Sequence, residues 1–337
     1  MESEGGRPVL RFRVEGKPIV FEDLIHGPMN FNPNDIGDFI VVRSDGMAAY
    51  NFACVIDDHS MEVTHVIRGE DHLSNTPRQI MIYQALGWEP PVFAHHPLIL
   101  GPDRTPLSKR HGVTAVSQYR EEGFLAEALL NYLVLLGWTS PSGEEILPLK
   151  KIVEDFSLQA ISKSAPVHNR KKLEWLNSFY IREMKDEELA ERLLPYVRRA
   201  GLSAKQQGDP NELILIARAV RDNLVVLSDV EHYLGIFYDE RFSYDDGART
   251  VLSDPRHQET LRSVLAVFED PSTGGPEDPR TLLARIEEKT GRKGKALYAP
   301  LRAALTGKTK GPELVKALPI LGKERILRRI RMALEIR

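Results

Sequence analysis

One short stretch of the sequence brings together residue types that can bind phosphate. Residues 106–112, with the sequence PLSKRHG, place Ser108, Lys109 and Arg110 in succession. Lysine and arginine donate charge-assisted hydrogen bonds to phosphate oxygens, and a serine hydroxyl can add another. A loop carrying these groups can close over a nucleotide and stabilise the negative charge that develops on a departing pyrophosphate. An ordinary polar surface turn has the same composition, so the spacing alone leaves both interpretations open.

A second candidate site lies within residues 48–72. Arg68 falls where a strand that reads as buried runs out into a polar loop, and open α/β sheets bind ligands at the carboxyl ends of their strands. A guanidinium in that position can hold a carboxylate through two hydrogen bonds, with Tyr50 lining the pocket. A structural ion pair of Arg68 with Glu70 or Asp71 explains the same pattern equally well.

The remaining titratable residues of this part of the chain give weaker signals. Asp57 and Asp58 could suggest a metal, but two adjacent carboxylates more often form a cap or a local salt bridge. His65, His95 and His96 lack the spacing of metal ligands. We interpret them as histidines that pack or form hydrogen bonds.

The composition narrows the class of protein. At 337 residues the chain is long enough for two or three domains with hydrophobic cores. Cys54 is its one cysteine, which excludes an intramolecular disulfide and a cysteine-based zinc site and fits a reducing compartment. There is no apolar run of about 18 residues and no apolar signal-peptide core at the start. We therefore expect a soluble cytoplasmic protein with no membrane partner and no structural zinc.

The charge is unevenly distributed. The chain carries a net charge of −3, yet residues 281–337 contain 15 Lys and Arg against 5 Asp and Glu. A basic end on a mildly acidic chain suggests a polyanionic partner for that end. Solvated helix faces would give the same excess of positive charge, so both interpretations remain open.

The first third of the chain is predicted to be α/β. Residues 9–14 alternate apolar and basic side chains, turn at residues 15–16 toward a strand at 18–21, and are followed by a strand at 38–43. Residues 92–100 supply one or two further short strands. The strands and the helix between them indicate an α/β unit.

The helix of this unit has clear boundary signals. Thr76 is predicted as its N-cap, Pro77 as its first residue and Gln79 as the partner that completes a capping box. Gly87 is predicted to end the helix.

From about residue 113 the spacing of apolar residues is helical. Residues 124–138 are apolar on nearly every face, which predicts a buried helix ending at Gly137. The last segment places Ile326, Ile330 and Leu334 on one stripe, with arginines around the rest. The fold class is therefore predicted to be α/β followed by an all-α remainder.

Several motifs, in order, resemble those of the bacterial glutamyl-tRNA synthetases, which are class I aminoacyl-tRNA synthetases. They include YNFACVIDD, THVIRGEDHLSNTPRQIMIYQALGW, LILGPDRTPLSKRHG, SKSAPVHNRKKLEWLNSFYI and RKGKALYAPLRAALTGKTKGPEL. The resemblance covers nearly the whole chain. The related glutaminyl-tRNA synthetases read their anticodon with β-barrels, so the helical C-terminal half favours the glutamyl branch.

The resemblance implies four regions. Residues 1–48 resemble the β-rich remainder of an insertion domain that packs near the tRNA acceptor end. Residues 49–112 resemble the second half of a Rossmann-type catalytic domain, residues 113–185 a helical region that contacts the tRNA stem, and residues 186–337 an all-α anticodon-binding domain.

The resemblance also assigns roles to individual residues. The family's K-M-S-K-S signature aligns with Pro106, Leu107, Ser108, Lys109 and Arg110. The second lysine of the signature contacts ATP and stabilises the adenylation transition state, a role that falls on Lys109. Proline replaces the first lysine, which removes a cation and stiffens the loop. Tyr50 and Arg68 match positions that line the amino-acid pocket and hold glutamate, and His72 lies close to the same pocket.

The implied partners follow from the family. They are ATP with Mg²⁺, glutamate and tRNA(Glu), with tRNA(Gln) left open as a second substrate, and the chain is expected to be a monomer. The basic residues expected to contact the anticodon stem and loop are Arg292, Lys293, Lys295, Arg328 and Arg329. Phosphate contacts there would make binding depend on salt, while unpaired bases would be read by stacking and hydrogen bonds.

The family's first signatures are missing from this sequence. Members begin with an R-F-A-P-S-P-T-G-like loop and an H-I-G-H-type motif, whereas residues 24–28, LIHGP, align with the insertion domain. The chain is therefore expected to lack the first half of the catalytic domain and to have little activity alone. A truncated synthetase, one half of a split synthetase and a non-catalytic tRNA-binding homologue are the three alternatives.

Overall fold

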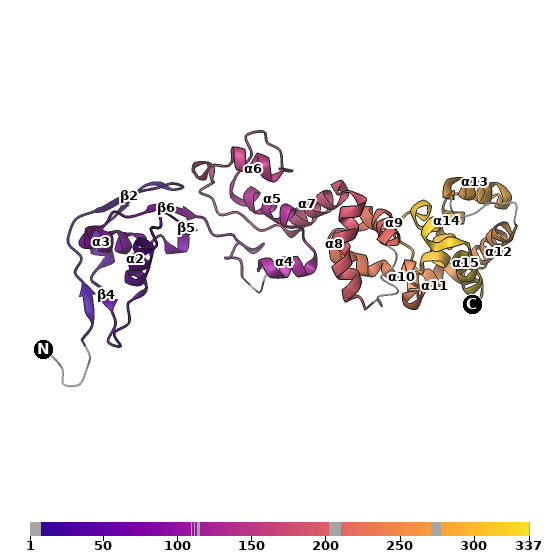
Figure 1. Ribbon diagram of the computed structural model, residues 1–337, viewed down its shortest axis with the longest axis horizontal. Helices are drawn as coiled ribbons and strands as arrows, with labels where there is room; N and C mark the ends of the chain where they lie inside the picture. The colour runs from indigo at the N-terminus through magenta and orange to yellow at the C-terminus, as the bar shows by residue number, and fades with distance from the viewer. Residues whose placement is uncertain are drawn as a thin grey trace. The chain divides into compact units, whose positions relative to one another are not determined.

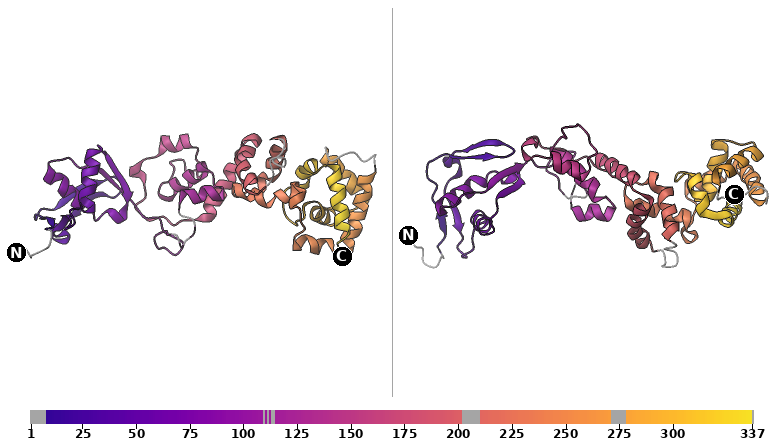
Figure 2. Two further views of the ribbon diagram at one scale, coloured as in Figure 1. Left: turned by 60° about the horizontal axis from the view of Figure 1, so that its bottom comes forward. Right: turned by 45° about the horizontal axis from the view of Figure 1, so that its top comes forward.

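The computed structural model describes residues 8–108, 110, 112, 115–201, 210–270 and 278–336. The chain folds as two compact units (Figures 1 and 2). The first unit comprises Met1–Thr114 and Leu130–Arg170, and the second comprises Ala115–Leu129 and Lys171–Arg337. Both units are discontinuous in sequence, because the chain passes from one to the other three times.

The first unit is built on a four-stranded sheet. In spatial order its strands are β3 (Gly27–Phe31), β2 (Ile19–Asp23), β6 (Val92–His96) and β5 (His65–Gly69). β2 and β3 form an antiparallel hairpin, whereas β5 and β6 are parallel and β6 pairs in parallel with the end of β2. A separate two-stranded sheet pairs β1 (Leu10–Phe12) with β4 (Phe39–Val42).

Helix α3 (Thr76–Leu86) joins two hydrophobic clusters of this unit. Its Ile80 and Met81 pack with Phe93 of the four-stranded sheet. Its Ile82 and Tyr83 pack with Val55 of α2 (Tyr50–Ser60). Figure 1 shows α2 and α3 beside the strands, and a one-turn helix, α1 (Pro33–Ile36), precedes β4. The structure thus holds the segment that follows β5 against both the sheet and α2.

The turn at residues 15–16 leads to β2, while β1 pairs with β4. Two features of this unit differ from the sequence-based expectations. β5 is the outer strand of its sheet and not a buried strand, and its Ile67 is 57% exposed. The N-cap of α3 is Asn75, and neither its side chain nor a capping box closes the helix start. Gly87, with φ 72°, does end the helix as predicted.

The first unit also contains helices from beyond residue 129. They are α5 (Ala126–Gly137), which continues from the second unit, and α6 (Leu149–Asp155). Trp138, Leu147 and Ile152 form a small core here. α5 ends at Gly137 as predicted, but Leu130 and Leu133 are exposed, so the expectation that this helix is buried on nearly every face is wrong.

The second unit is entirely helical within its described residues. Its remaining helices are α4 (Val116–Glu122), α7 (Arg170–Glu183), α8 (Asp186–Arg199), α9 (Pro210–Val220), α10 (Leu234–Phe237), α11 (Asp246–Leu252), α12 (Pro255–Glu269), α13 (Pro279–Thr290), α14 (Lys295–Thr306) and α15 (Leu314–Leu334). Helices α8, α9 and α10 contribute to one hydrophobic core, and α12 to α15 contribute to a second. The helical character predicted after residue 113 is confirmed.

Short 3₁₀ helices also occur among the described residues of both units. They are Glu70–His72 and Leu158–Ala160 in the first unit, and Arg221–Asn223, Leu227–His232 and Asp239–Arg241 in the second.

Helix α15 closes the second core with the apolar stripe that the sequence predicts. Ile326 and Ile330 are fully buried, and Leu334 packs against the same cluster. The helix bends at Gly322, whose φ of 70° and ψ of 160° are not helical. Within the described ranges, no helix is long and apolar enough to cross a membrane.

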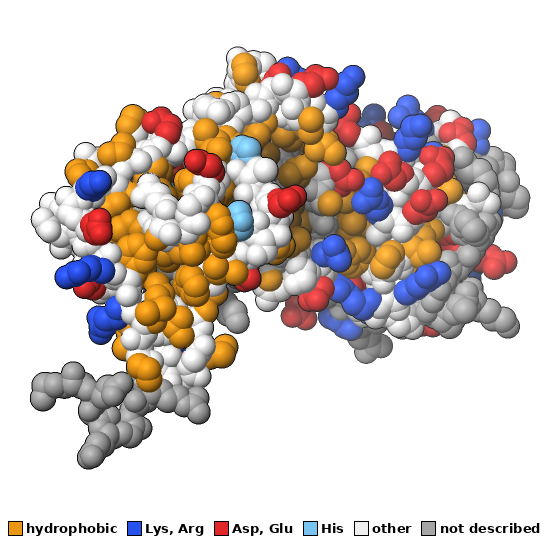
Figure 3. Space-filling view, turned by 60° about the vertical axis from the view of Figure 1, so that its left-hand side comes forward, with side chains coloured by type: hydrophobic (Ala, Val, Ile, Leu, Met, Phe, Trp, Pro, Cys, Tyr) orange, Lys and Arg blue, Asp and Glu red, His pale blue; other side chains and the backbone are white. Residues whose placement is uncertain are grey.

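The first unit carries exposed apolar side chains, which gather on the face that Figure 3 shows. Tyr50, Met61 and Ile67 are among its exposed apolar residues. Tyr50 and Ile67 lie on the same elements as the candidate carboxylate site.

Candidate functional site

Arg68 lies at the centre of a polar cluster at the end of β5. Its Nε donates to Nε2 of His95 at 3.2 Å, and its Nη2 donates to Oγ1 of Thr76 at 2.9 Å and to Oε1 of Gln79 at 2.8 Å. The parallel pairing of β5 with β6 places Arg68 opposite His95, and the first turns of α3 supply the other two partners. Thr76 and Gln79 therefore hold a guanidinium and do not form the capping box that the sequence suggests.

The partners of Arg68 are all uncharged. In the described part of the chain no carboxylate forms an ion pair with it: Glu70 accepts from the backbone of Leu98, and Asp71 lies 3.8 Å from Nε2 of His72. The alternative of a structural ion pair is therefore not found. A guanidinium has five N–H donors, and Nη1 makes no hydrogen bond to any described residue. The half-buried Arg68 thus has two donors and a full positive charge available for an anion.

Tyr50 and His72 lie together beside this cluster. The Tyr50 hydroxyl is 3.4 Å from Nδ1 of His72, and the two ring centroids are 5.8 Å apart. Although the Tyr50 side chain is 54% exposed, desolvation on the side of this cluster, followed by a hydrogen bond with Cys54, raises the pKa of Tyr50, while the positive charge of Arg68 opposes the rise. Tyr50 is therefore a neutral hydrogen-bonding group at physiological pH.

A chain of amide side chains connects the two groups. Gln79 Nε2 donates to Oδ1 of Asn51 at 3.2 Å, and Asn51 Nδ2 donates to Oδ1 of Asn75 at 3.5 Å. The side-chain amide of Asn75 in turn lies 3.2 Å from Nδ1 of His72. The structure thus brings together three residues singled out from the sequence, Tyr50, Arg68 and His72, through neutral residues that sequence reasoning missed.

The phosphate-binding candidate loop is only partly described. Leu107 donates its backbone N–H to Ile99, and Pro106 forms an isolated bridge with Leu100. Lys109, to which the resemblance gives the catalytic charge, lies outside the described residues, as does the neighbouring His111.

The flanking cation of this loop contacts the loop itself. Arg110 donates from Nη2 to Oγ1 of Thr105 at 2.8 Å and lies 3.9 Å from Asp103. Ser108 also forms an interaction within the protein. The side chain of Arg110 is largely exposed, so its contacts with Thr105 and Asp103 can be exchanged for contacts with a ligand.

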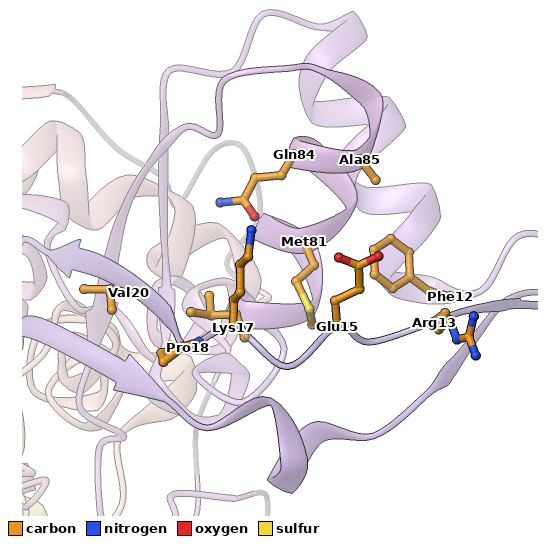
Figure 4. A pocket seen from close by; sticks show the side chains of 10 residues that line it. Phe12, Arg13, Glu15, Lys17, Pro18, Val20, Met81, Gln84 and Ala85 are labelled. Atoms are coloured by element: carbon orange, nitrogen blue, oxygen red, sulfur yellow. The ribbon is translucent and has the colours of Figure 1, made fainter.

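A hollow in the first unit lies away from these candidate sites. It measures about 530 Å³ and is lined by Arg13, Glu15 and Lys17 together with Met81 and Gln84 of α3 (Figure 4). Those α3 residues belong to the C-terminal half of the helix, whereas Thr76 and Gln79 belong to its N-terminal half. None of the residues predicted to bind glutamate or ATP lines this hollow.

The five predicted tRNA contacts differ in availability. Lys293 and Lys295 are exposed. Arg292 donates to Oγ1 of Thr260 at 2.8 Å and pairs with Glu259 at 3.1 Å. Arg328 pairs with Asp239 and is 54% exposed.

Arg329 is fully buried and corrects the sequence-based expectation. Its guanidinium donates to the carbonyl oxygens of Ile236 and Leu305 and to Oδ1 of Asp239, and it lies 3.9 Å from the ring centre of Phe242. Burial lowers its pKa to about 10, against the opposing effect of Asp239. Arg329 therefore stabilises the helical core from within and is not available to an RNA.

The paired carboxylates, Asp57 and Asp58, do not have the roles that the sequence suggests. Asp57 and Asp58 lie in the last turns of α2, where neither caps the helix nor forms a salt bridge with a described residue, which corrects that interpretation. Burial raises the pKa of Asp58. No group of three or more His, Cys, Asp or Glu side chains within the described ranges is arranged to hold a metal ion.

The hydrogen-bonding interpretation of the histidines is confirmed. His65 lies 3.0 Å from the hydroxyl of Thr64, and His96 lies 2.6 Å from the carbonyl oxygen of Pro97. His95 joins the Arg68 cluster.

Comparisons with known proteins identify the family and the fold of the chain. Residues 1–175 match the family model of the class I tRNA synthetase (E and Q) catalytic domain, and residues 188–334 match that of an anticodon-binding domain. The chain therefore combines a class I synthetase catalytic-domain fold, with its mixed sheet, and a helical anticodon-binding domain.

Individual relatives are more specific. The chain is 46% identical to glutamate–tRNA ligase 2 of Syntrophus aciditrophicus over 336 residues, which is 100% of this chain and 69% of the relative. It is 44% identical to the glutamate–tRNA ligase of Carboxydothermus hydrogenoformans, covering 97% of this chain and 69% of that protein. A crystal structure of a glutamate tRNA ligase from Elizabethkingia meningosepticum, in complex with its amino acid, superposes with a TM-score of 0.82 at 27% identity, covering 98% of this chain and 68% of that one. The chain belongs to the glutamate–tRNA ligase family.

Proposed function

We propose that this chain serves a cytoplasmic glutamate–tRNA ligase reaction. Glutamate would be activated by ATP to an acyl adenylate with release of pyrophosphate, and the glutamyl group would then pass to a hydroxyl of the 3′-terminal adenosine of tRNA(Glu) with release of AMP. The observation that carries the proposal is the cation at the carboxyl end of β5: Arg68 is held by neutral side chains and has Nη1 unused by any described residue.

A carboxylate of glutamate fits this environment. No described carboxylate of the protein is bonded to the guanidinium of Arg68. A bound anion would therefore gain a charge-assisted hydrogen bond without displacing an existing ion pair. The Tyr50 hydroxyl and the His72 ring would supply further hydrogen-bonding contacts on the side of the amide chain. Arg68 would thus orient the amino acid, and rate enhancement would come chiefly from positioning.

The nucleotide would be bound as a substrate together with its Mg²⁺. Mg²⁺ is usually held by nucleotide phosphates and water with few protein ligands. Lys109 would stabilise the charge that develops on the departing pyrophosphate, with Ser108 and Arg110 as further donors. Pro106 supplies no cation at the loop entrance, so we expect a smaller electrostatic contribution there than a lysine would give.

Turnover by this chain alone should be slow. Glutamate carries two carboxylates, and the cluster described around Arg68 contains one guanidinium. The second carboxylate would therefore have no cation in the described cluster, which weakens binding and leaves the substrate poorly oriented for attack on ATP.

The second unit would bind the RNA. Lys293 and Lys295 are exposed cations that can contact phosphates, and their contribution should fall as salt concentration rises. We take tRNA(Glu) as the substrate and a monomer as the working form. Charging assays with tRNA(Gln) would show whether a second tRNA is accepted.

The test is ATP–pyrophosphate exchange with glutamate and tRNA(Glu), using the chain and its Lys109→Ala variant. We expect a low rate that falls by about 10²–10³-fold in the variant, with Lys150→Ala, an exposed lysine on α6, unchanged. Equal rates in the chain and in Lys109→Ala would contradict the assignment of Lys109. No exchange, together with salt-sensitive binding of tRNA(Glu), would instead favour a non-catalytic tRNA-binding homologue or one half of a split synthetase.

A further inference from the structure

A buried acid and histidine lie directly behind Arg68. Asp23 is the last residue of β2 and His95 lies on β6, so the two residues and Arg68 occupy three consecutive strands of the sheet. Both side chains are completely buried, and Oδ2 of Asp23 is 2.6 Å from Nδ1 of His95. The proposed function gives Asp23 no role and uses His95 only as one of the neutral partners of Arg68, although both residues carry groups that are costly to bury.

Asp23 is held in its ionised form. Its Oδ1 accepts the backbone N–H groups of Ile25 and His26, both at 2.9 Å, and its Oδ2 accepts the backbone N–H of His95 at 3.1 Å. Burial alone raises the pKa of this carboxyl, but the hydrogen bonds from His26, His95 and Ile25 outweigh it and keep the pKa below its ordinary value. An ionised carboxylate can only accept hydrogen bonds.

The ring nitrogens of His95 have three neighbours: Asp23 at Nδ1, and Arg68 together with the Thr76 hydroxyl, 3.0 Å away, at Nε2. The hydroxyl can either donate or accept, so Asp23 and Arg68 decide where the proton lies. Because Asp23 can only accept, Nδ1 of His95 must carry the hydrogen. Because the guanidinium of Arg68 can only donate, Nε2 of His95 must be the unprotonated acceptor, at 3.2 Å from Nε of Arg68. Burial also lowers the pKa of His95, against the opposing effect of Asp23. His95 is thus neutral and protonated at Nδ1.

We propose that Asp23 and His95 are positioning residues for Arg68. The carboxylate fixes the tautomer of the imidazole, the imidazole nitrogen fixes Nε of the arginine, and Thr76 and Gln79 fix Nη2. With three of its donors engaged, the plane of the guanidinium is set, and Nη1 is presented to a carboxylate ligand. The identity of that ligand as glutamate rests on the proposed function, but the positioning does not.

A purely structural pair would give different results from a positioning pair. If Asp23 and His95 only tie β2 to β6, any substitution that preserves the fold should leave the Arg68 side chain unchanged. If they position Arg68, the location of one proton on His95 should decide the hydrogen bond of Nε. Asp23→Asn separates the two possibilities. Its side-chain oxygen can still accept from Ile25 and His26, while its amide N–H₂ would face Nδ1 and move the imidazole proton to Nε2, where it opposes the N–H of Arg68.

The first measurement is ¹⁵N NMR of the full chain labelled in histidine and arginine side chains. In the unsubstituted chain we expect the Nδ1-protonated signature for His95, assigned by its loss in His95→Gln, and an Arg68 Nε–H protected from exchange with water. Asp23→Asn should reverse the tautomer and remove the protection. Asp38→Asn is the matched control, because Asp38 accepts a backbone N–H at 2.8 Å in an exposed part of the same unit. A charged or Nε2-protonated His95 in the unsubstituted chain would overturn the proposal.

The second measurement is calorimetric titration with glutamate, alongside thermal unfolding. His95→Leu removes the acceptor for Arg68, whereas His95→Gln can present a side-chain oxygen to it, and both lose the bond to Asp23. We expect about a tenfold rise in the glutamate Kd for His95→Leu, with partial rescue in His95→Gln, although the two variants lose similar thermal stability. Affinities that simply follow stability would contradict positioning. Absence of glutamate binding by the unsubstituted chain would contradict the proposed ligand, while the NMR measurement would still decide the positioning.

Discussion

Two arginines, one in each unit, show how the protein uses the same side chain for different purposes. Arg329 is fully buried and donates to Asp239 and to the carbonyl oxygens of Ile236 and Leu305. Arg68 is half-buried and donates to three neutral side chains, those of His95, Thr76 and Gln79. The first guanidinium has a carboxylate partner in the fold, and the second has none among the described residues.

The difference lies in what neutralises the charge. A buried cation needs a counter-ion, because the desolvation cost is otherwise not recovered. Arg329 has Asp239 as its counter-ion and two carbonyl oxygens as further acceptors, although its Nε has no partner among the described residues, so its charge belongs to the helical core. Arg68 is fixed in direction but not neutralised, so an anionic ligand can complete its environment. The chemistry of the partners therefore separates the two arginines.

The largest expected effect concerns Arg329. Arg329→Met should lower the free energy of unfolding of the second unit by about 3–5 kcal/mol, because two buried carbonyl oxygens and one contact with Asp239 lose their donor. The measurement is urea unfolding followed by far-ultraviolet circular dichroism. Arg328→Met, which removes an exposed contact to the same aspartate, should cost less than about 1 kcal/mol. Equal losses in the two variants would remove the structural distinction drawn here.

A smaller loss of stability is expected at Arg68. Arg68→Met should lower the stability of the first unit by about 1–2 kcal/mol, because Thr76 and His95 can still bond to each other at 3.0 Å. The same change should raise the glutamate Kd by at least about tenfold, since a charge-assisted hydrogen bond is lost. Calorimetric titration and thermal unfolding of the same samples measure both quantities. If stability fell as far as in Arg329→Met while the affinity for glutamate stayed the same, the two arginines would have to be classed together.

Acid should destabilise the first unit before the second. The pKa of His95 in the folded chain lies below its ordinary value of 6.5, so the unfolded chain takes up this proton first. The stabilising contribution is therefore complete above pH 6.5 and declines as the pH falls below it, by at most about 1.4 kcal/mol per pH unit. Asp239 of the second unit, whose pKa is lowered from 3.8 by its arginine partners despite burial, loses its contribution only below pH 3.8.

Thermal unfolding of the first unit between pH 7.5 and about pH 5.5 measures this effect. His95→Gln should reduce the pH dependence. His168→Gln is the control, because His168 also lies in the first unit and has its pKa lowered by burial and by Arg170. This substitution should leave unchanged the part of the pH dependence that comes from His95. A pH dependence that is unaffected by His95→Gln would rule out a neutral His95 as its source.

The smallest effect is expected at the exposed lysines of the second unit. Lys293→Ala and Lys295→Ala should change the unfolding free energy by no more than about 0.5 kcal/mol each. Each should nevertheless reduce the slope of log Kd for tRNA(Glu) against log salt by about 0.7–0.9. Filter binding at several salt concentrations measures the slope, with the exposed Lys150 of the first unit as control. An unchanged slope in both variants would show that Lys293 and Lys295 do not bind an anionic ligand, in contrast to the role proposed for Arg68.

The sequence predicts the parts of this structure that local pattern determines. The α/β-to-helical order, the helix end at Gly87 and the buried stripe through Ile326 and Ile330 follow from turn chemistry and periodicity. The position of Arg68 at a strand end is also predictable. These features depend on residues close together in the chain.

Features that depend on tertiary contacts were not predictable from local pattern. Thr76 and Gln79 have the spacing of a capping box, yet they bond to a guanidinium on another strand. Helix α2 buries only Val55, so it lacks a strong periodic signal. The apolar residues of β5 predict a strand, but they do not show whether that strand is paired on both edges or on one edge alone.

The burial of Arg329, which was expected to contact tRNA, is predictable from the sequence. It lies three residues after Ile326 and four before Ala333, so helical spacing places it on the buried stripe. An arginine on such a stripe predicts an internal acceptor set more readily than an RNA contact.

The interleaving of the two units has a consequence for synthesis on the ribosome. Residues 115–129 leave the ribosome before the first unit is complete at Arg170, although they pack with helices that are still to be made. At ordinary elongation rates α9, the later of the two helices that cover this segment, is complete roughly 5–20 s later. Until then the apolar side chains of Leu125 and Ala128, which end up buried among residues of α8 and α9, have no native partners. We expect this early segment to be the part of the nascent chain most dependent on chaperone binding.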